Sequence, residues 1–522
     1  MEKALQIVRR WFDPRAGAQD FILARWVFLR ALALIYLSAF YSLLFQIEGL
    51  IGPQGILPAG NYLRAIAQYY GSTGMWHAPS LFWFSSSASA VMTVTWMGIA
   101  ASLLALVNVW PRASLFLCWV CFLSFVSAAS DFSSYQSDGM LLEAGFIALF
   151  FAPPGLWPGF AAEHPPSRAS LWLLRWEWFR IYFESGVVKE LSRDPQWRNF
   201  TAMDEYYQNS PLPTWIGWYV EHLPHWFHAA SVAATLGMEL VLVFMLFLPR
   251  RGRLICFCIV TSWEIGVILT GNYAFLNYIV VALGFLLLDD GYLARAIPAR
   301  WRPLRAGEPA AERGLRAVVH GAGVVFAAIM LTWIGYATTA KMVDLAGPRI
   351  LPLAPAAPLE PFRIANQYGL FAVMTRGRYE IELQGSNDGQ NWQPYLFTHK
   401  PQLLHEAPRI YAPYQPRFDW NLWFASLGDW QQNDIVPITE ERLLMNDRDV
   451  VGLFRNDPFG GSAPRSVRAV LWQYWFTSLE EKQRTGNWWR RKLLGLYAPA
   501  IERTPDGQFE IAAPPDRLPE HD

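Results

Sequence analysis

Residues 181–197 have the sequence Ile181-Tyr-Phe-Glu-Ser-Gly-Val-Val-Lys-Glu-Leu-Ser-Arg-Asp-Pro-Gln-Trp197, in which charged side chains interrupt a membrane-like segment. A charged side chain at the centre of a bilayer costs about 2.5–3.5 kcal/mol on insertion scales, so it usually faces a bundle interior, a cavity or a partner. The charges in and just before this segment are therefore the first candidates for a functional site: Glu177, Arg180, Glu184 and Lys189.

The composition of the whole chain also indicates a membrane protein. Of its 522 residues, 53% are hydrophobic and only 16% are charged, with 26 tryptophans. Soluble domains carry about 25% charged residues. The formal net charge is zero. No basic stripe is present to attract a polyanion, so a nucleic-acid partner is not expected.

The apolar segments predict a polytopic helical bundle over residues 1–340. A membrane-spanning helix needs about 20 mostly apolar residues. Roughly nine segments approach this pattern: 23–47, 81–107, 113–130, 140–157, 170–188, 228–248, 254–270, 272–290 and 317–338. Three of them are short, and the fifth carries charges, so these four are the least typical spans.

The distribution of basic residues predicts the orientation of this bundle, because short cytoplasmic loops collect Lys and Arg. With the N-terminus inside, the inner loops contain Arg112, Arg168, residues 250–253 and the basic stretch 295–316. An odd number of spans then places the C-terminal part in the periplasm or ER lumen. We expect an integral multi-pass protein of a bacterial inner membrane or, in a eukaryote, of the ER membrane.

A proline-rich stretch at residues 341–361 predicts a stiff linker of extended polyproline geometry before an outer domain at 362–522. In that domain, residues 379–385 alternate like a half-buried strand, and Asn387-Asp388-Gly389 is a strong hairpin turn. The run 466–477 could complete the same sheet, and a helix is expected around 438–454. We predict a β-rich, sandwich-like domain with helical insertions.

Several stretches resemble the lipase maturation factor family. In the membrane part they are Ala24–Tyr36, Gly49–Ala59, Asp138–Phe146 and Phe183–Asn199, and in the outer domain Asn366–Arg376, Gly385–Trp392 and Pro416–Ala425. The resemblance implies a multi-pass membrane protein that, in animals, sits in the ER and helps secreted lipases fold and assemble. A chaperone-like role of this kind requires neither catalysis nor a cofactor. The chain has no GxSxG elbow, so it does not resemble a lipase itself.

A shorter resemblance suggests an alternative. The run Tyr182-Phe183-x-x-Gly186-Val187-x-Lys189-x-Leu191 is similar to a membrane segment of vitamin K-dependent γ-carboxylase and its bacterial relatives. That similarity implies an enzyme acting on a lipid or quinone-like substrate, with Lys189 as base and Glu143 or Glu184 as partner. The competing interpretation is a lysine that snorkels and pairs with Glu184 or Glu190.

Other ionisable residues allow two interpretations. Glu143, Glu239 and Glu264 fall in apolar segments and could line one polar cavity with Arg25, Arg30 and Arg180, either as a substrate site or as pairs that hold helices together. His222, His225 and His228 are spaced like a one-sided metal cluster, but Pro224 argues against the helix that this needs. No metal site is expected.

Four exposed-aromatic candidates in the outer domain are proposed to bind a client: Trp420, Trp423, Phe424 and Trp430. A large apolar patch often marks an interaction surface. The alternative is that these rings fill the core of the domain. The expected partners are an exported client protein, for which a lipase is one candidate, and membrane lipids. The sequence leaves the client and the oligomeric state open.

Overall fold

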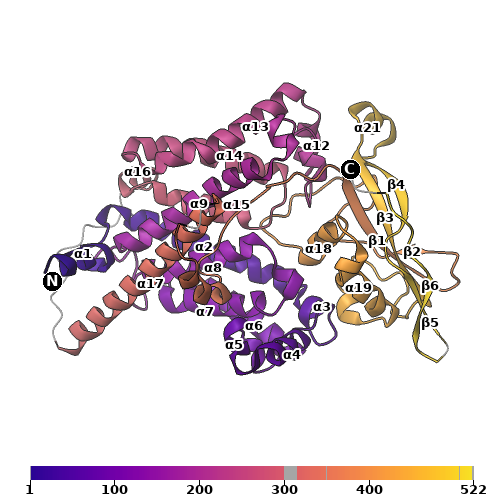
Figure 1. Cartoon of the computed structure of the whole chain (residues 1–522), viewed down its shortest axis with the longest axis horizontal. Coiled ribbons are helices and arrows are strands. Elements are labelled where there is room, and N and C mark those ends of the chain that lie inside the picture. Colours follow the sequence, from indigo (N-terminus) through magenta and orange to yellow (C-terminus); the bar gives the residue numbers. More distant parts are fainter. Residues whose placement is uncertain (1, 299–313, 348–349, 505, 520–522) are drawn as a thin grey trace.

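The computed structural model describes residues 2–298, 314–347, 350–504 and 506–519. A helical bundle holds the N-terminal two thirds of the chain, and a β-sheet lies at the end of the molecule farthest from the N-terminus (Figure 1). Part of the basic stretch expected in an inner loop, residues 299–313, lies outside the described residues.

The bundle contains both long helices and short connecting ones. The longer helices are α1 (Glu2–Phe12), α2 (Ile22–Leu44), α4 (Ala59–Tyr70), α6 (Ala88–Leu106), α7 (Pro111–Val126), α8 (Gln136–Phe151), α9 (Arg168–Ser192), α13 (His225–Leu240), α14 (Arg250–Thr270), α15 (Leu276–Gly284) and α17 (Leu315–Leu345). The short helices are α3 (Ile47–Ile51), α5 (Gly74–His77), α10 (Pro195–Arg198), α11 (Tyr206–Asn209), α12 (Trp215–Glu221) and α16 (Asp290–Ala296).

Each of the nine expected apolar segments coincides with one of these helices. Five helices of the described residues are long and apolar enough to cross a membrane, namely Gln19–Leu44, Ala88–Leu106, His225–Phe247, Arg250–Thr270 and Ala317–Leu345. Helix α7 and the segment Leu276–Leu287 are apolar but shorter. Helix α8 has 16 residues, and α9 has 25 residues but carries the charges described above. By length and hydropathy the membrane character is clear, whereas a count of nine spans is not reached.

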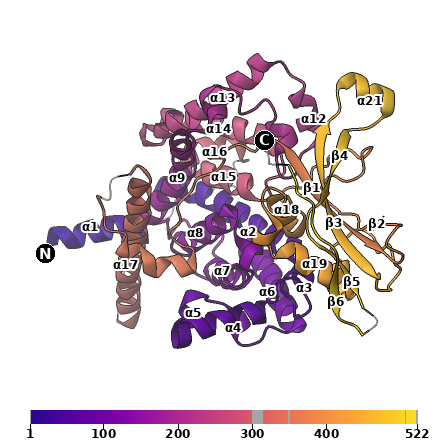
Figure 2. The ribbon, with the colours of Figure 1, turned by 45° about the vertical axis from the view of Figure 1, so that its right-hand side comes forward.

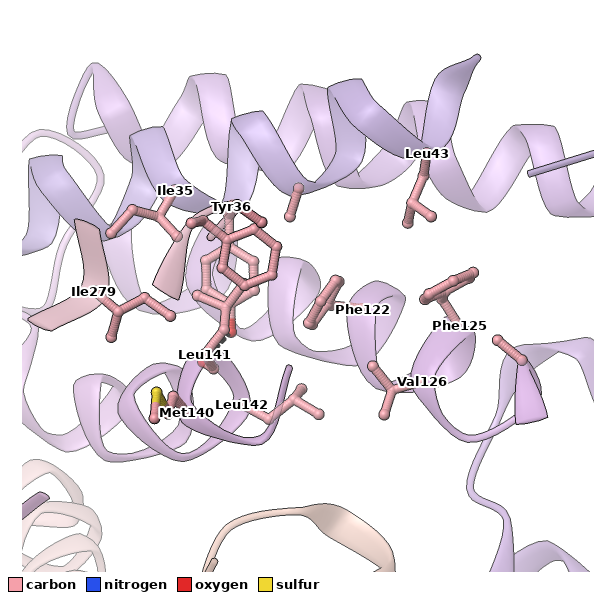
Figure 3. Packing of buried hydrophobic residues seen from close by; sticks show 14 of the residues in the cluster. Ile35, Tyr36, Leu43, Phe122, Phe125, Val126, Met140, Leu141, Leu142 and Ile279 are labelled. Carbon is pink, nitrogen blue, oxygen red and sulfur yellow. Dashed lines mark hydrogen bonds between the residues drawn. The ribbon is translucent and has the colours of Figure 1, made fainter. Parts of the chain in front are cut away.

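The bundle core forms where α2 packs against α6, α7 and α8. Tyr36 of α2 is fully buried and donates a hydrogen bond from its hydroxyl to the carbonyl of Leu141, 3.1 Å away (Figure 3). Its ring lies edge-on to Phe122 with 6.0 Å between centroids. Gly145 faces the same hydroxyl, and a Cβ atom there would overlap it. These contacts fix the mutual positions of α2, α7 and α8.

The expected linker is not an extended polyproline segment. Residues Ala354–Phe362 form the 3-10 helix η9, which packs along α17. Trp333 of α17 donates its indole N–H to the carbonyl of Pro355 at 2.6 Å, and Lys341 pairs with Glu360 at 3.0 Å. The prediction of an extended geometry was wrong because Trp333 and Lys341 of α17 donate to this segment and stabilise it as a compact helix packed on α17.

The C-terminal part is built on one antiparallel sheet with the order β2-β1-β3-β5-β6, in which β4 also pairs with β3. The strands are β1 (Arg378–Ser386), β2 (Gln393–Pro394), β3 (Ser466–Phe476), β4 (Trp489–Leu496), β5 (Ala500–Arg503) and β6 (Phe509–Ala513). The helices are α18 (Arg417–Ala425), α19 (Ile435–Leu444), α20 (Arg448–Val451) and α21 (Leu479–Thr485). The predicted hairpin, the pairing of 466–477 with it and the helix near 438–454 are confirmed.

The hairpin turn shows the expected chemistry. Asp388 accepts hydrogen bonds from the backbone N–H groups of Asn391 and Gln390, at 2.7 and 2.9 Å. These donors hold the pKa of its carboxyl below the ordinary range. Gly389 takes a φ of +70°, a conformation that glycine adopts without steric cost.

Two expectations about this domain need correction. The described strands form one sheet, not a sandwich, because α18 and α19 occupy the face on which a second sheet would pack (Figure 2). Strand β1 is not half-buried, since all nine of its residues are buried. Its polar side chains pair with one another and with neighbours: Arg378 contacts Glu380, and Glu382 lies 2.9 Å from Arg491. The alternating polar residues of β1, which predicted a solvent-exposed face, instead form a buried ionic network.

Candidate functional site

Helix α9 carries the four charged candidates Glu177, Arg180, Glu184 and Lys189, and all four are buried. Glu177, Arg180 and Glu184 have no exposed surface, and Lys189 is 2% exposed. The helix contacts α8, α13, α15 and α17, so its charged face has neighbours on several sides. The segment 363–375, which follows η9, also crosses this face through the contacts described next.

Arg180 joins Glu143 of α8 to the C-terminal part of the chain. One terminal nitrogen contacts the Glu143 carboxylate, and the other donates to the carbonyl of Asn366 at 2.8 Å. The second Glu143 oxygen accepts from the Asn366 backbone N–H at 2.8 Å and from the Tyr368 hydroxyl at 3.1 Å. Glu143 therefore holds the segment 363–375 against the bundle.

Glu184 makes a similar contact with the same segment. Its Oε2 accepts from the backbone N–H of Tyr368 at 2.6 Å, and its Oε1 lies 3.9 Å from Arg180. Neither Glu143 nor Glu184 contacts Lys189, so the structure does not bring the three proposed catalytic residues together as a triad. Both carboxylates act on Arg180 and on the crossing segment.

Lys189 pairs with a residue that the sequence had not matched to it. Its ammonium lies 2.8 Å from Glu239 of α13, 3.0 Å from the carbonyl of Leu370 and 3.4 Å from that of Ser185. The ring of Trp197 lies 5.1 Å from the same nitrogen. An ammonium has three N–H donors, and each has an acceptor here. The expected partners Glu184 and Glu190 are replaced by Glu239, because α13 packs directly on α9.

Lys189 and Glu239 line a cavity of about 230 Å³. A third ionisable residue, Glu264 of α14, lies on its wall and accepts from the Tyr182 hydroxyl at 2.9 Å and from the Asn277 amide at 2.6 Å. The rest of the wall is mainly apolar and aromatic: Ile181, Met203, Phe227, Met238, Val267 and Val280. A few polar groups in an apolar cavity are typical of a small-molecule site.

The predicted single polar cavity is divided into separate clusters. Glu143 lies with Arg180, whereas Glu239 and Glu264 line the cavity at Lys189. Arg25 donates instead to the carbonyls of Phe160, Ala161 and His164, and Arg30 to those of Ala105 and Leu106. These two arginines donate hydrogen bonds to backbone carbonyls and do not line the cavity at Lys189.

The four aromatic candidates differ in exposure. Trp420 and Trp423 of α18 are buried, with 7% and 6% of their surface exposed, whereas Phe424 is 46% exposed. Trp430 is partly exposed. Trp420, Trp423 and Phe424 line a cleft of about 400 Å³ between α18, the start of α8 and the segment 369–375. Trp420 and Trp423 thus belong to the core, whereas Phe424 reaches the surface.

The cleft and the cavity share one wall. Five residues face both spaces: Tyr206, Leu276, Leu370, Phe371 and Met374. Phe371 is strained, with a φ of +56°, and its ring lies 5.3 Å from that of Tyr273. Strained non-glycine residues persist only where the surroundings over-determine them, and they cluster at binding sites. Trp197 supports this residue by donating its indole N–H to the Phe371 carbonyl at 3.0 Å.

Sequence reasoning missed the ionic contact that joins the two parts of the chain. Arg417 of α18 and Asp138 of α8 are both fully buried and form a bidentate pair at 2.7 and 2.8 Å. Asp138 lies two residues before the expected apolar segment 140–157. The available signal was an isolated acid at the start of an apolar segment, which requires a partner of opposite charge.

The three histidines contact different groups. The ring of His222 lies between the carbonyls of Trp218 and Thr477, that of His225 lies 2.9 Å from Asp204, and that of His228 contacts the carbonyl of Leu223. No group of three or more potential ligands suited to a metal ion occurs among the described residues.

Comparison with known proteins identifies the family. Residues 23–295 match the lipase maturation factor transmembrane domain, and residues 364–499 match the lipase maturation factor C-terminal domain. The chain belongs to the lipase maturation factor family. Both matched regions contain residues of the site, since Glu143, Lys189 and Glu239 lie in the first and Tyr368 and Arg417 in the second.

Curated relatives match this lipase maturation factor family member over most of its length. It is 32% identical to lipase maturation factor 2 of Gallus gallus, over 95% of this chain and 84% of the relative. It is 30% identical to lipase maturation factor 1 of Bos taurus, over 94% of this chain and 91% of the relative. Human lipase maturation factor 2 is 31% identical over 92% of this chain. No solved structure matches the chain. The family expected from the sequence motifs is confirmed.

Proposed function

We propose that this family member assists the folding or assembly of exported client proteins, with lipases, the clients in the names of its relatives, as the first class to test. The observation that carries the proposal is the open cleft beside α18. Its floor contains the buried rings of Trp420 and Trp423, and its rim presents Phe424 and Val373, which are 46% and 69% exposed. An apolar cleft with exposed apolar rims is suited to an extended hydrophobic segment of an incompletely folded chain.

The experiment is site-specific photocrosslinking in intact cells. A photoreactive phenylalanine analogue placed at Phe424 or Val373 is expected to capture exported proteins during their maturation. The matched control is Ile511 of β6, which is 66% exposed and does not line the cleft. Deletion of the protein should reduce the specific activity of the captured clients, and Phe424→Ser should do so in part. Equal capture from Phe424 and Ile511 would contradict client binding in the cleft.

The membrane arrangement belongs to the same proposal. We place the N-terminus in the cytoplasm, nine spans in the bilayer and the domain after residue 362 in the periplasm or ER lumen. The coincidence of all nine apolar segments with helices supports this topology. Reporter fusions after residues 110, 160, 249 and 346 test it: the first three should report the cytoplasm and the last the outer side.

A second candidate function rests on the cavity at Lys189. Lys189, Glu239 and Glu264 face an apolar space of about 230 Å³, as a carboxylase-like enzyme acting on a lipid or quinone-like substrate would need. For Lys189 to act as base, one of its three acceptors must be released. Export of active client from cells carrying Lys189→Met together with Glu239→Leu separates the two functions. If the double variant is stable and supports full maturation of the client, the protein acts in folding without Lys189 as a base. If it is stable but fails to support maturation, the enzymatic function is favoured.

A further inference from the structure

One wall of the cleft beside α18 is a continuous length of chain. All seven residues at positions 369–375 line the cleft, and they belong to neither a helix nor a strand. Another wall is a face of α18, along which Trp420, Trp423 and Phe424 follow one another at the spacing of a helical turn. A partner in the cleft therefore meets main chain on one side and apolar rings on another.

Both ends of the chain wall are held by side-chain amides. The amide oxygen of Gln136 accepts from the N–H of Gly369 at 2.9 Å, and its nitrogen donates to the carbonyl of Gly369 at 3.2 Å. At the other end, the amide of Asn209 donates to the carbonyl of Thr375 at 3.0 Å. These contacts fix where the wall begins and ends along the cleft.

The middle of the wall is held by two side chains at α10. Asp194, the N-cap of this helix, accepts from the N–H of Met374 at 2.7 Å, and Trp197 donates to the carbonyl of Phe371 at 3.0 Å. Because both contacts lie within the same protein, the wall is ordered before any partner arrives. Binding to an ordered segment avoids the entropic cost of fixing it.

Between these contacts, the main chain of Val373 is unpaired. Neither its N–H nor its carbonyl makes a hydrogen bond with another residue in the described part of the chain. Val373 lines the cleft and is one of its most exposed residues. A free N–H and a free carbonyl on one residue are the two groups that a residue of an antiparallel strand exchanges with the residue opposite.

The cleft also contains no charge. Its described lining residues are apolar, aromatic, hydroxyl-bearing or amide side chains, together with glycine and proline, and none is acidic or basic. A charged side chain of a partner would lose water there without gaining a counterion. The lining therefore favours an uncharged segment.

We propose that a client lies in the cleft as an extended, uncharged segment that exchanges two main-chain hydrogen bonds with Val373 and packs its apolar side chains on the rings of α18. This inference rests on the proposed client-binding function and adds how the client is recognised. Main-chain hydrogen bonds give affinity that does not depend on one particular sequence. They also select chains that have not yet folded, because a folded segment has already paired its N–H and carbonyl groups.

The test measures binding of a fluorescein-labelled peptide to the full chain purified in detergent, by fluorescence anisotropy. The peptide is short, capped at both ends and made of leucine, valine and threonine. Ester bonds in place of its central amide bonds remove the N–H donors and keep the side chains, and they should weaken binding about tenfold. Glutamate in place of a central leucine should weaken binding by about the same factor or more.

Variants of the protein locate the hydrogen bonds. Val373→Pro removes the free N–H, so it should bind the amide and ester peptides about equally, whereas Val373→Thr keeps the N–H and should still prefer the amide. Phe424→Ser should weaken both peptides, and Ile511→Ser, outside the cleft lining, is the control.

The outcomes separate this inference from the function on which it rests. Equal binding of amide and ester peptides by the wild type, or an unchanged preference in Val373→Pro, would overturn main-chain pairing. Failure to bind any of the peptides would overturn it too. Photocrosslinking at Phe424 in cells reports independently whether clients enter the cleft, so its success beside a failed peptide test would leave the proposed function standing.

Discussion

The guanidinium of Arg417 lies 2.7 and 2.8 Å from the two carboxylate oxygens of Asp138, a residue 279 positions earlier in the chain. Both side chains are fully buried. Arg417 also donates to the carbonyl of Phe132 at 2.6 Å. This pair ties α18, and through it the sheet, to α8 of the bundle.

Arg417→Met should therefore destabilise the junction by about 3–5 kcal/mol, because it leaves the Asp138 carboxylate buried without its partner. Adding Asp138→Leu should recover most of the loss, since a buried pair replaced by apolar residues is often neutral. Thermal unfolding in detergent, followed by tryptophan fluorescence, measures both effects. Arg484→Met on the exposed helix α21 is the control. A single variant as stable as this control would show that the pair contributes little.

Lys189→Met should cost a similar amount, about 3–5 kcal/mol, by leaving Glu239 without its partner at 2.8 Å. Glu239→Leu in the same chain should restore stability, which the unfolding temperature will report. Glu190→Gln alters the next residue along the same helix, an exposed one, and should change nothing. If the double variant stays as unstable as the single one, Lys189 is held mainly by the carbonyls of Leu370 and Ser185.

Gly145→Ala should destabilise the bundle by about 1–3 kcal/mol, because the added methyl group would overlap the hydroxyl of Tyr36. Tyr36→Phe removes that hydroxyl and should rescue part of the loss in the double variant. The measurement compares the unfolding temperatures of Gly145→Ala, Tyr36→Phe and the double variant with that of the wild type. Gly237→Ala, at a position where a Cβ atom meets nothing, is the control. If Tyr36→Phe does not restore stability to the Gly145→Ala variant, the overlap with the Tyr36 hydroxyl is not the cause of the destabilisation.

The buried Glu440 of α19 should make the stability of the outer domain depend on pH. Burial raises the pKa of this carboxyl well above its ordinary value. Its stabilising, protonated form is fully present below about pH 4.3, the unfolded value, and is lost as the pH rises through the raised native pKa. Stability should therefore fall with rising pH, and Glu440→Gln should flatten this slope. Unfolding temperatures from pH 5 to 9 test this, with the exposed Glu441→Gln as control.

Local patterns predicted local structure well. The turn at residues 387–389 contains its own determinants, an aspartate that accepts backbone N–H groups and a glycine with positive φ, so the hairpin followed from a few residues. The apolar segments gave the helices for the same reason, since length and hydropathy are properties of one segment. The extended motifs gave the family.

Pairing between distant segments was not predictable in this way. Lys189 has charged residues at nearby positions on its own helix, yet its partner is Glu239, which helix packing brings within 2.8 Å. Strand β1 alternates polar and apolar residues as a half-buried strand does, but Glu380 pairs with Lys400 and Glu382 with Arg491, and both glutamates are buried. In both places the sequence shows which charges need partners, and only the tertiary fold decides which ones they obtain.

The segment 363–375 has a consequence for biosynthesis. Glu184 accepts the backbone N–H of Tyr368, which the ribosome adds 184 residues later. At about 5–20 residues per second, α9 must wait roughly 10–40 s for this donor. During that interval Glu143, Glu184 and Lys189 lack contacts that they have in the finished protein. A factor that is proposed to help other proteins mature thus itself passes through an unfinished state, which only the arrival of its own C-terminal half completes.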